Sequence, residues 1–323
     1  MLLTRSATIT DQEYFTLLLR LADRLEPTSR RRIVQAVERA REGIREEAIA
    51  EALRTLNSDA VLGVLAVDQV AEGLARSIVT VSREMVEGLG PTITAQTAQL
   101  LGVELEWEAV SHRALLWVKR HGAEMATVMS DVTRETLRKV IAQAIREPLS
   151  RAATVKLVRG AIGLNGPQTV ALRNYWGDLD QAVGAGEISA ARAAQLAERY
   201  RQRLLKYRAT MITRTETMTA GNNAQREVWR AIGAAAEVYV RESVGIMRDG
   251  RICSFCHGRH GWRAKVGGRY QDGSDGPPWP HGGKGTTVGC RCQERLVRED
   301  DPEPSSPAFV EPEDGGSLRP LIE

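Results

Sequence analysis

The sequence is poor in aromatic residues and has no long apolar run. Phe, Trp and Tyr make up only 5% of the 323 residues. The longest apolar run, Val61 to Val67, is far shorter than the roughly 20 residues that a membrane-spanning helix needs. Only two apolar residues follow Met1 before the first polar one, which does not resemble a secretory signal. We therefore expect a protein that is made in a reducing cytosol and does not enter a membrane.

An excess of charge of one sign is also missing. The formal net charge is +3, which by itself does not indicate a nucleic-acid-binding protein. The distribution is more informative, because residues 298–323 hold two Arg against eight acids, a charge of −6, and residues 1–297 therefore carry +9. This predicts a weakly basic body followed by an acidic, Pro-rich tail that is disordered or extended along a partner, with Phe309 and Leu321 as apolar anchors.

Ala, Arg, Glu and Leu dominate the composition, which favours helix over sheet. Apolar residues recur at helical spacing over the first two-thirds of the chain. We expect a first helix from Asp11, which Pro27 ends or separates from the next, and a second from Arg30 to Asn57. A third should run from Asp59 to the sequence "GLGP" at 88–91, and a fourth from Glu104 to Glu147 with a candidate break at Gly122. A fifth should begin at Asn165–Gly166–Pro167 and be interrupted by "VGAGE", and a last should run from Ser189 to about Ile232.

The texture changes after Gly233. "AEVYVRESV" alternates and is β-branched, so it predicts a strand, and Gly and Pro are dense from Gly245 to Gly289. A small loop-rich domain of this kind buries little apolar surface and needs an additional crosslink for stability. The expected fold is mainly α: an elongated helical body, a small α+β, zinc-stabilised, loop-rich module and an extended acidic tail. The expected parts are an N-terminal helical region (1–150), a helical core (151–240), the module (241–297) and the tail (298–323).

All four cysteines of the chain lie in two places within this module. Cys253 and Cys256 have the spacing of a zinc knuckle, in which two thiolates reach one metal. The second pair, Cys290 and Cys292, is tighter and supplies either one ligand or two. The sequence therefore predicts a tetrahedral Zn²⁺ held by four cysteines, or by three cysteines and His281.

We interpret this zinc site as structural rather than catalytic. A catalytic zinc keeps an open coordination position and has a general base nearby. His257 or His260 could serve as such a base, as in HNH-type nucleases, but the sequence shows no second histidine–asparagine half. The sequence therefore offers no candidate catalytic residue.

Basic residues crowd the loop that follows the first cysteine pair, and an aromatic residue lies among them. Such a loop binds a phosphate backbone by charge neutralisation and stacking, docks on an acidic protein surface, or simply faces solvent. The sequence leaves these three interpretations open. The residues are Arg259, Trp262, Arg263, Lys265 and Arg269.

Four polar residues stand out in the apolar pattern of the last long helix: Arg208, Arg214, Glu216 and Asn223. Arg214 and Glu216 are two residues apart and so do not face each other on a helix. We expect the four to be partly buried and to join the helical body to the zinc module. The alternative is that they line a solvated face.

Three stretches of the sequence carry motifs that follow one another in a fixed order. The first is "AIGLNGPQTVALRNY" at 161–175, and the second is "YRATMITRTETMTAGNNA" at 207–224. The third is a pattern of Asp, two cysteines, Gly, two prolines, His and Cys-Arg-Cys. Its residues here are Asp249, Cys253, Cys256, Gly261, Pro277, Pro278, His281, Cys290, Arg291 and Cys292. Together the three stretches resemble the phage head morphogenesis, or Mu F-like minor head protein, family.

The resemblance covers roughly residues 150–297 and implies a structural component of a tailed-phage virion. Such a minor head protein is assembled in the bacterial host cytoplasm, lies in the head near the portal vertex, and contacts the portal protein and the major capsid protein or other head proteins. It acts in head morphogenesis, with a further role in DNA packaging or delivery. The alternatives are a DNA-binding accessory protein that uses the basic module and, less favoured, an HNH-type nuclease.

The chain departs from the family pattern in one place. The family has its histidine three residues before Cys-Arg-Cys, whereas "GGKGTTVG" separates His281 from Cys290 in this sequence. This longer spacing favours the arrangement in which four cysteines bind the metal.

Overall fold

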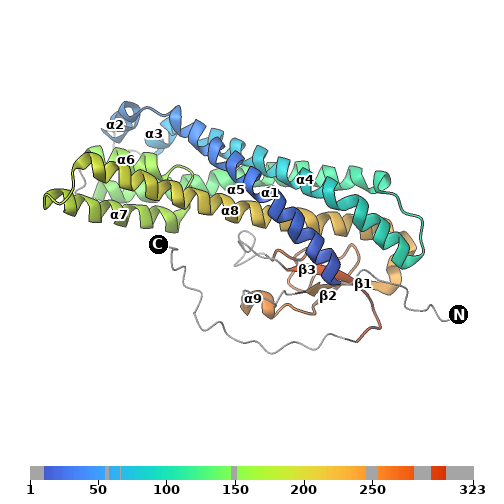
Figure 1. The fold of residues 1–323 in the computed structure, drawn as a ribbon. Helices are drawn as coiled ribbons and strands as arrows, with labels where there is room; N and C mark the ends of the chain where they lie inside the picture. The colour runs from blue at the N-terminus through green and yellow to red at the C-terminus, as the bar shows by residue number, and fades with distance from the viewer. Residues whose placement is uncertain are drawn as a thin grey trace. The chain divides into compact units, whose positions relative to one another are not determined.

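The computed structural model describes residues 11–54, 58–65, 67–146, 151–244, 254–279 and 292–302. Within these ranges the fold is mainly α, as predicted, with nine α-helices followed by a small three-stranded antiparallel sheet (Figure 1). None of the described helices has the length and apolarity to cross a bilayer. The helices are α1 (Asp11–Glu42), α2 (Glu46–Arg54), α3 (Ser58–Val64), α4 (Val67–Leu101), α5 (Trp107–Arg146), α6 (Arg151–Ala161), α7 (Gly166–Gly184), α8 (Ala190–Ala231) and α9 (Ser254–His257), and a 3-10 helix, η1 (Gly233–Val238), precedes the strands β1 (Tyr239–Val244), β2 (Arg263–Lys265) and β3 (Gln293–Arg298).

The chain forms two compact units that interleave along the sequence. We call residues 25–81 and 117–213 the helical unit, and residues 1–24, 82–116 and 214–323 the sheet unit. Helices α1, α4, α5 and α8 each contribute to both. The linear domain boundaries expected from the sequence stay a prediction.

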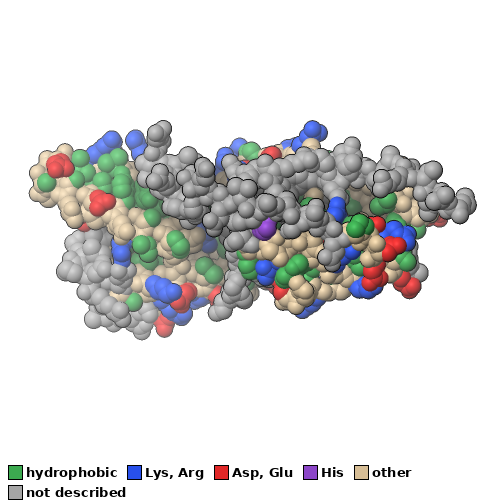
Figure 2. Space-filling view, turned by 90° about the horizontal axis from the view of Figure 1, so that it is seen from below, with side chains coloured by type: hydrophobic (Ala, Val, Ile, Leu, Met, Phe, Trp, Pro, Cys, Tyr) green, Lys and Arg blue, Asp and Glu red, His purple; other side chains and the backbone are tan. Residues whose placement is uncertain are grey.

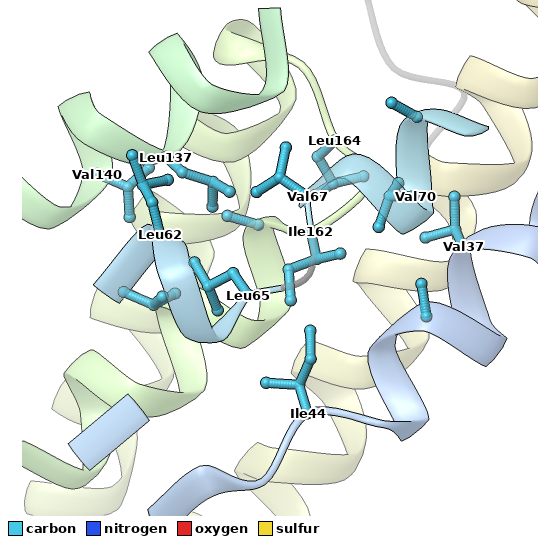
Figure 3. Packing of buried hydrophobic residues seen from close by; sticks show 14 of the residues in the cluster. Val37, Ile44, Leu62, Leu65, Val67, Val70, Leu137, Val140, Ile162 and Leu164 are labelled. Atoms are coloured by element: carbon cyan, nitrogen blue, oxygen red, sulfur yellow. The ribbon is translucent and has the colours of Figure 1, made fainter. Parts of the chain in front are cut away.

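The helical unit is built around one hydrophobic cluster. Figure 3 shows side chains of α1, α3, α4 and α5, and of the link between α6 and α7, directed into a common interior. Many of these residues are fully or almost fully buried. Burial of aliphatic side chains from several helices is the main favourable contribution to the stability of such a bundle. The residues labelled in the figure are Val37, Ile44, Leu62, Leu65, Val67, Val70, Leu137, Val140, Ile162 and Leu164.

The start of α7 follows the prediction. Asn165 caps the helix: its side chain accepts a hydrogen bond from the backbone N–H of Gln168 at 3.0 Å. The side chain of Gln168 in turn accepts one from the Asn165 N–H at 3.3 Å, which completes a capping box. Pro167 lies in the first turn, where a missing N–H costs nothing.

Two helices continue through prolines at which the sequence suggested an end. Pro27 lies inside α1 and Pro91 inside α4, so the expected stops at these positions are wrong. A proline inside a helix removes one backbone hydrogen bond and crowds the preceding turn. Both of these helices are long and carry buried apolar residues on each side of the proline, so tertiary packing outweighs the local cost.

The glycines that suggested breaks instead allow close packing between helices. α5 continues through Gly122, where an added Cβ would lie 2.1 Å from a methyl group of Val79 in α4. α4 likewise continues through Gly90, where a Cβ would lie 2.3 Å from the indole ring of Trp107. Neither position has room for a side chain, so these glycines mark points of close approach rather than helix ends.

The sheet has the order β2-β1-β3, and both pairs of strands are antiparallel. The predicted strand in "AEVYVRESV" is β1, preceded by η1. In the register of the sheet, Arg241 pairs with Ala264 and Leu296, and Glu242 pairs with Arg263 and Arg295. Successive side chains point to opposite faces, so Arg241 and Glu242 lie on different sides of the sheet.

Gly163 is constrained both by its backbone conformation and by a close neighbour. Its φ of +80° is one that L side chains rarely adopt, and a Cβ there would lie 2.3 Å from Cγ1 of Val37. Gly163→Ala should therefore lower the free energy of unfolding by about 2–3 kcal/mol, as measured by chemical denaturation. Gly186→Ala is the matched control, because Gly186 has a φ of +74° and open space where a Cβ would lie, and it should cost only about 1 kcal/mol. Equal costs would show that the contact with Val37 is unimportant.

Candidate functional site

A fully buried carboxylate lies at the centre of the sheet unit. Glu294 of β3 is 1% exposed, and two guanidinium groups bind its oxygens. Arg226 of α8 donates from Nε to Oε2 at 2.5 Å, and Arg241 of β1 donates from Nη1 to Oε1 at 2.6 Å. The hydroxyl of Tyr270 donates to Oε1 at 2.9 Å. Burial, together with the neighbouring charge of Glu294, raises the pKa of Tyr270 well above its usual range.

The two arginines also hold the loop that leads up to Trp279. Arg241 donates to the carbonyl oxygens of Asp275 at 2.8 Å and Gly268 at 2.5 Å. Arg226 donates from Nη2 to the carbonyl oxygen of Pro277 at 2.7 Å. The Glu294 network therefore positions backbone as well as side chains, and a buried charge so fully bonded is structurally constrained.

The opposite face of the sheet carries a second buried carboxylate, Glu242 of β1, which is fully buried. It lies between its cross-strand neighbours: Arg263 of β2 binds Oε2 at 2.8 Å and Arg295 of β3 binds Oε1 at 2.5 Å. Burial lowers the pKa of the nearby His260, while the negative charge of Glu242 opposes that shift. Both buried carboxylates of the sheet are thus neutralised by arginines, and their role in the described structure is to hold strands together.

Asn222 of α8 joins two segments that are far apart in the sequence. Its side-chain amide donates to the carbonyl oxygen of Pro277 at 3.1 Å and to that of Cys292 at 3.0 Å. Asn222 is completely buried. In the sequence, His281 and Cys290 lie between these two carbonyl groups, so α8 fixes the chain on both sides of them.

The structure brings two of the five predicted zinc ligands into one small cluster. Cys256 and Cys292 are 3% and 4% exposed and belong to a buried cluster with Ala264, Tyr270 and Trp279. Cys253, His281 and Cys290 lie outside the described residues. Among the residues that are described, no group of three or more His, Cys, Asp or Glu side chains could hold a metal ion.

The basic loop is held within the module, and each of its cations pairs with an acid. The guanidinium of Arg259 lies 3.5 Å from the ring centroid of Phe255 and also faces the rings of Trp262 and Trp279. Trp262 is partly buried and packs edge-on against Trp279. The ion pairs are Arg259–Asp272 at 3.2 Å, Arg263–Glu242 at 2.8 Å, Lys265–Glu299 at 2.5 Å and Arg269–Asp275 at 3.5 Å.

This pairing weakens the DNA-binding interpretation of the loop, because a cation already bound to a carboxylate gains less from a phosphate. On the face drawn in Figure 2, the cationic and anionic side chains adjoin each other in several places. The described part of the acidic tail, residues 298–302, participates in the pairing: Glu299 binds Lys265, and Arg263 donates to the carbonyl oxygens of Asp301 and Pro302.

The four polar residues predicted on α8 do not form one group. Arg208, Glu216 and Asn223 are buried, whereas Arg214 is exposed, which contradicts the expectation for that residue. Arg208 donates at 2.7 Å to the carbonyl oxygen of Gly163 in the helical unit rather than to the module, and burial lowers its pKa to about 10. Residues two apart on a helix point in directions about 200° apart, which explains why Glu216 is buried and Arg214 is not.

Two residues of α8 that contact the module, Asn222 and Arg226, were not singled out from the sequence. The neighbouring residue, Asn223, was selected from the sequence instead of Asn222. Which of the two side chains points toward the module depends on the rotation of α8 about its axis. The charged strand residues Arg241, Glu242 and Glu294 were also missed. The sequence signal that could have identified them is the presence of charged residues within strands, in a segment that has few apolar residues with which to form a core.

No protein-family model matches this chain, and neither a curated protein nor a solved structure matches it. The likeness to phage minor head proteins therefore rests on the three sequence stretches alone.

The Glu294 network predicts a large effect of one conservative substitution. Glu294→Gln removes the charge that two buried guanidinium groups share, so the free energy of unfolding should fall by about 3 kcal/mol or more in chemical denaturation. Glu299→Gln is the control, because its ion pair with Lys265 is more than half exposed on both sides and should contribute less than about 1 kcal/mol. If the two variants unfold alike, the buried network does not stabilise the module.

Proposed function

We propose that this protein is a structural minor head protein of a tailed bacteriophage. It acts in head morphogenesis, close to the portal and the capsid interior, and it has no catalytic role. Its partners are the portal protein and the major capsid protein or other head proteins.

One observation carries the proposal: buried hydrogen bonds link the three stretches that resemble the family. Arg208 of the second stretch donates to the carbonyl oxygen of Gly163 in the first. Asn222, also of the second stretch, donates to the carbonyl oxygens of Pro277 and Cys292 in the third. Motif residues that bond to one another are expected to occur together in one family, because the loss of one leaves the buried polar group of another without its hydrogen-bond partner.

The zinc site is part of this proposal. Cys256 and Cys292, one from each cysteine pair, lie in the same buried cluster, and the other cysteine of each pair is a close neighbour in sequence. When bound, a zinc ion would crosslink the segment around α9 to the start of β3. The aromatic cluster around these cysteines is small, which fits a module whose stability depends on such a crosslink.

Metal analysis of the purified protein tests the site. We expect one zinc per chain after purification under reducing, chelator-free conditions. Cys256→Ser should lose the metal and unfold the module, seen as a loss of near-ultraviolet signal from Trp262 and Trp279, while the far-ultraviolet helical signal stays close to that of the unmodified protein. Zinc contributes on the order of 10 kcal/mol to the folding of small metal-binding modules. A zinc content near zero in the unmodified protein would contradict the proposal.

The location of the protein tests the function. Particles purified from a host that produces the phage should contain this chain at low copy number relative to the major capsid protein, and heads that lack it should be defective in assembly or in their DNA content. Arg226→Ala, which breaks the link between α8 and the third stretch, should reduce incorporation, whereas Arg120→Ala, an exposed change in α5, should not. A chain found only outside particles would overturn the assignment.

A further inference from the structure

A surface groove of about 450 Å³ lies where α7 and α8 adjoin in the helical unit. Its lining is mixed: Tyr175 and Leu196 supply apolar surface, and Arg199, Gln202, Arg203 and Lys206 supply polar groups. Tyr175 packs against Tyr200 with ring centroids 4.6 Å apart, so a second aromatic ring helps to hold this side chain in place.

The cations of the groove lie on one side of α8. Arg199, Arg203 and Lys206 follow each other at spacings of four and three residues, which places them on a common helix face. All three are exposed, and among the described residues none of the three has a carboxylate within ion-pair distance. Arg203 does face the ring of Tyr200, at 5.5 Å from its centroid. These cations differ from those of the basic loop, each of which has an acid partner.

A ligand for this groove must combine negative charge with an apolar anchor. The cations extend over eight residues, or about 10 Å of helix, which matches a short peptide better than a duplex, whose phosphates spread along a longer path. An acidic segment that also presents an aromatic or aliphatic side chain would satisfy both the arginines and the Tyr175–Leu196 wall.

The chain itself contains such a segment. Residues 303–323 hold five acids and one arginine, and Phe309, Leu318 and Leu321 are apolar residues among them. The 21 residues that follow Pro302 span up to about 70 Å when extended. The preceding acidic residue Glu299 already binds a cation of this chain, Lys265, so pairing between the tail and basic side chains has a precedent in the structure.

We propose that the groove lined by Tyr175, Leu196, Arg199, Gln202, Arg203 and Lys206 docks the acidic C-terminal segment, residues 303–323, of a second copy of this chain. The choice of a second copy rests on the proposed assembly function. One sequence then carries both halves of the contact, and the copies join head to tail through a heterologous interface.

Carbodiimide cross-linking of the intact protein tests this docking, because the reagent joins a lysine amine directly to a carboxylate that touches it. Lys206 should cross-link to Glu311, Glu313 or Asp314, as identified by mass spectrometry. Lys119 is the internal control, an exposed lysine of α5 outside the groove, and it should not. An equal mixture of isotopically light and heavy chains should give mixed cross-linked pairs in about half of the products.

A charge-removing variant provides the second measurement. Arg199→Gln with Arg203→Gln should reduce the Lys206 cross-link about fivefold, since two exposed ion pairs are lost. Arg31→Gln with Arg120→Gln removes the same charge from exposed sites elsewhere and should leave the yield unchanged.

Three results would overturn the proposal. If Lys206 cross-links to the segment no more than Lys119 does, the segment does not reach the groove. Cross-links confined to chains of one label would place a chain's own segment there. Binding of a labelled DNA duplex that weakens in the groove variant, without any cross-link to the segment, would make nucleic acid the occupant. None of these results bears on whether the protein is found in virions, so the two proposals fail independently.

Discussion

The sheet unit depends on one buried carboxylate. Glu294 is bound by Arg226 from α8 and Arg241 from β1, so a single side chain connects a helix, two strands and the loop carbonyls that the arginines also bind. Placing these charges away from water is costly, and the cost is offset only because almost every donor finds an acceptor. Such a network tolerates little rearrangement, which suits a module whose apolar cluster contains few residues.

The sequence predicted those features that depend on neighbours along the chain. The start of α7 followed from Asn165–Gly166–Pro167, because a cap is a contact between residues three apart. Strand β1 followed from a local alternation of β-branched residues. The mainly helical character followed from composition and periodicity, which add up over long windows.

Features that depend on distant partners could not be predicted. The sequence indicated breaks at Pro27 and Gly122, yet both lie inside helices, because contacts from other segments outweigh the local preference. The sequence of β3, "QERLVR", is charged and by itself does not indicate a buried strand. It is partly buried because Glu294 binds arginines of β1 and α8, and Arg295 binds Glu242 of β1. The candidate site shows the same limit, since nothing in the sequence distinguishes Asn222 from Asn223, and the contacts of Asn222 with the module depend on the packing of α8.

The hydrogen bonds of Asn222 to Pro277 and Cys292 have a consequence for how this chain tolerates change in length. One helix side chain fixes the backbone on both sides of His281 and Cys290, so a change in the number of residues between these two need not move either anchored carbonyl. The entropy of closing a flexible loop grows only with the logarithm of its length, and a doubling costs about 0.6 kcal/mol. A variant of this chain with more or fewer residues between His281 and Cys290 should therefore lose little stability as long as it retains the amide donor of Asn222.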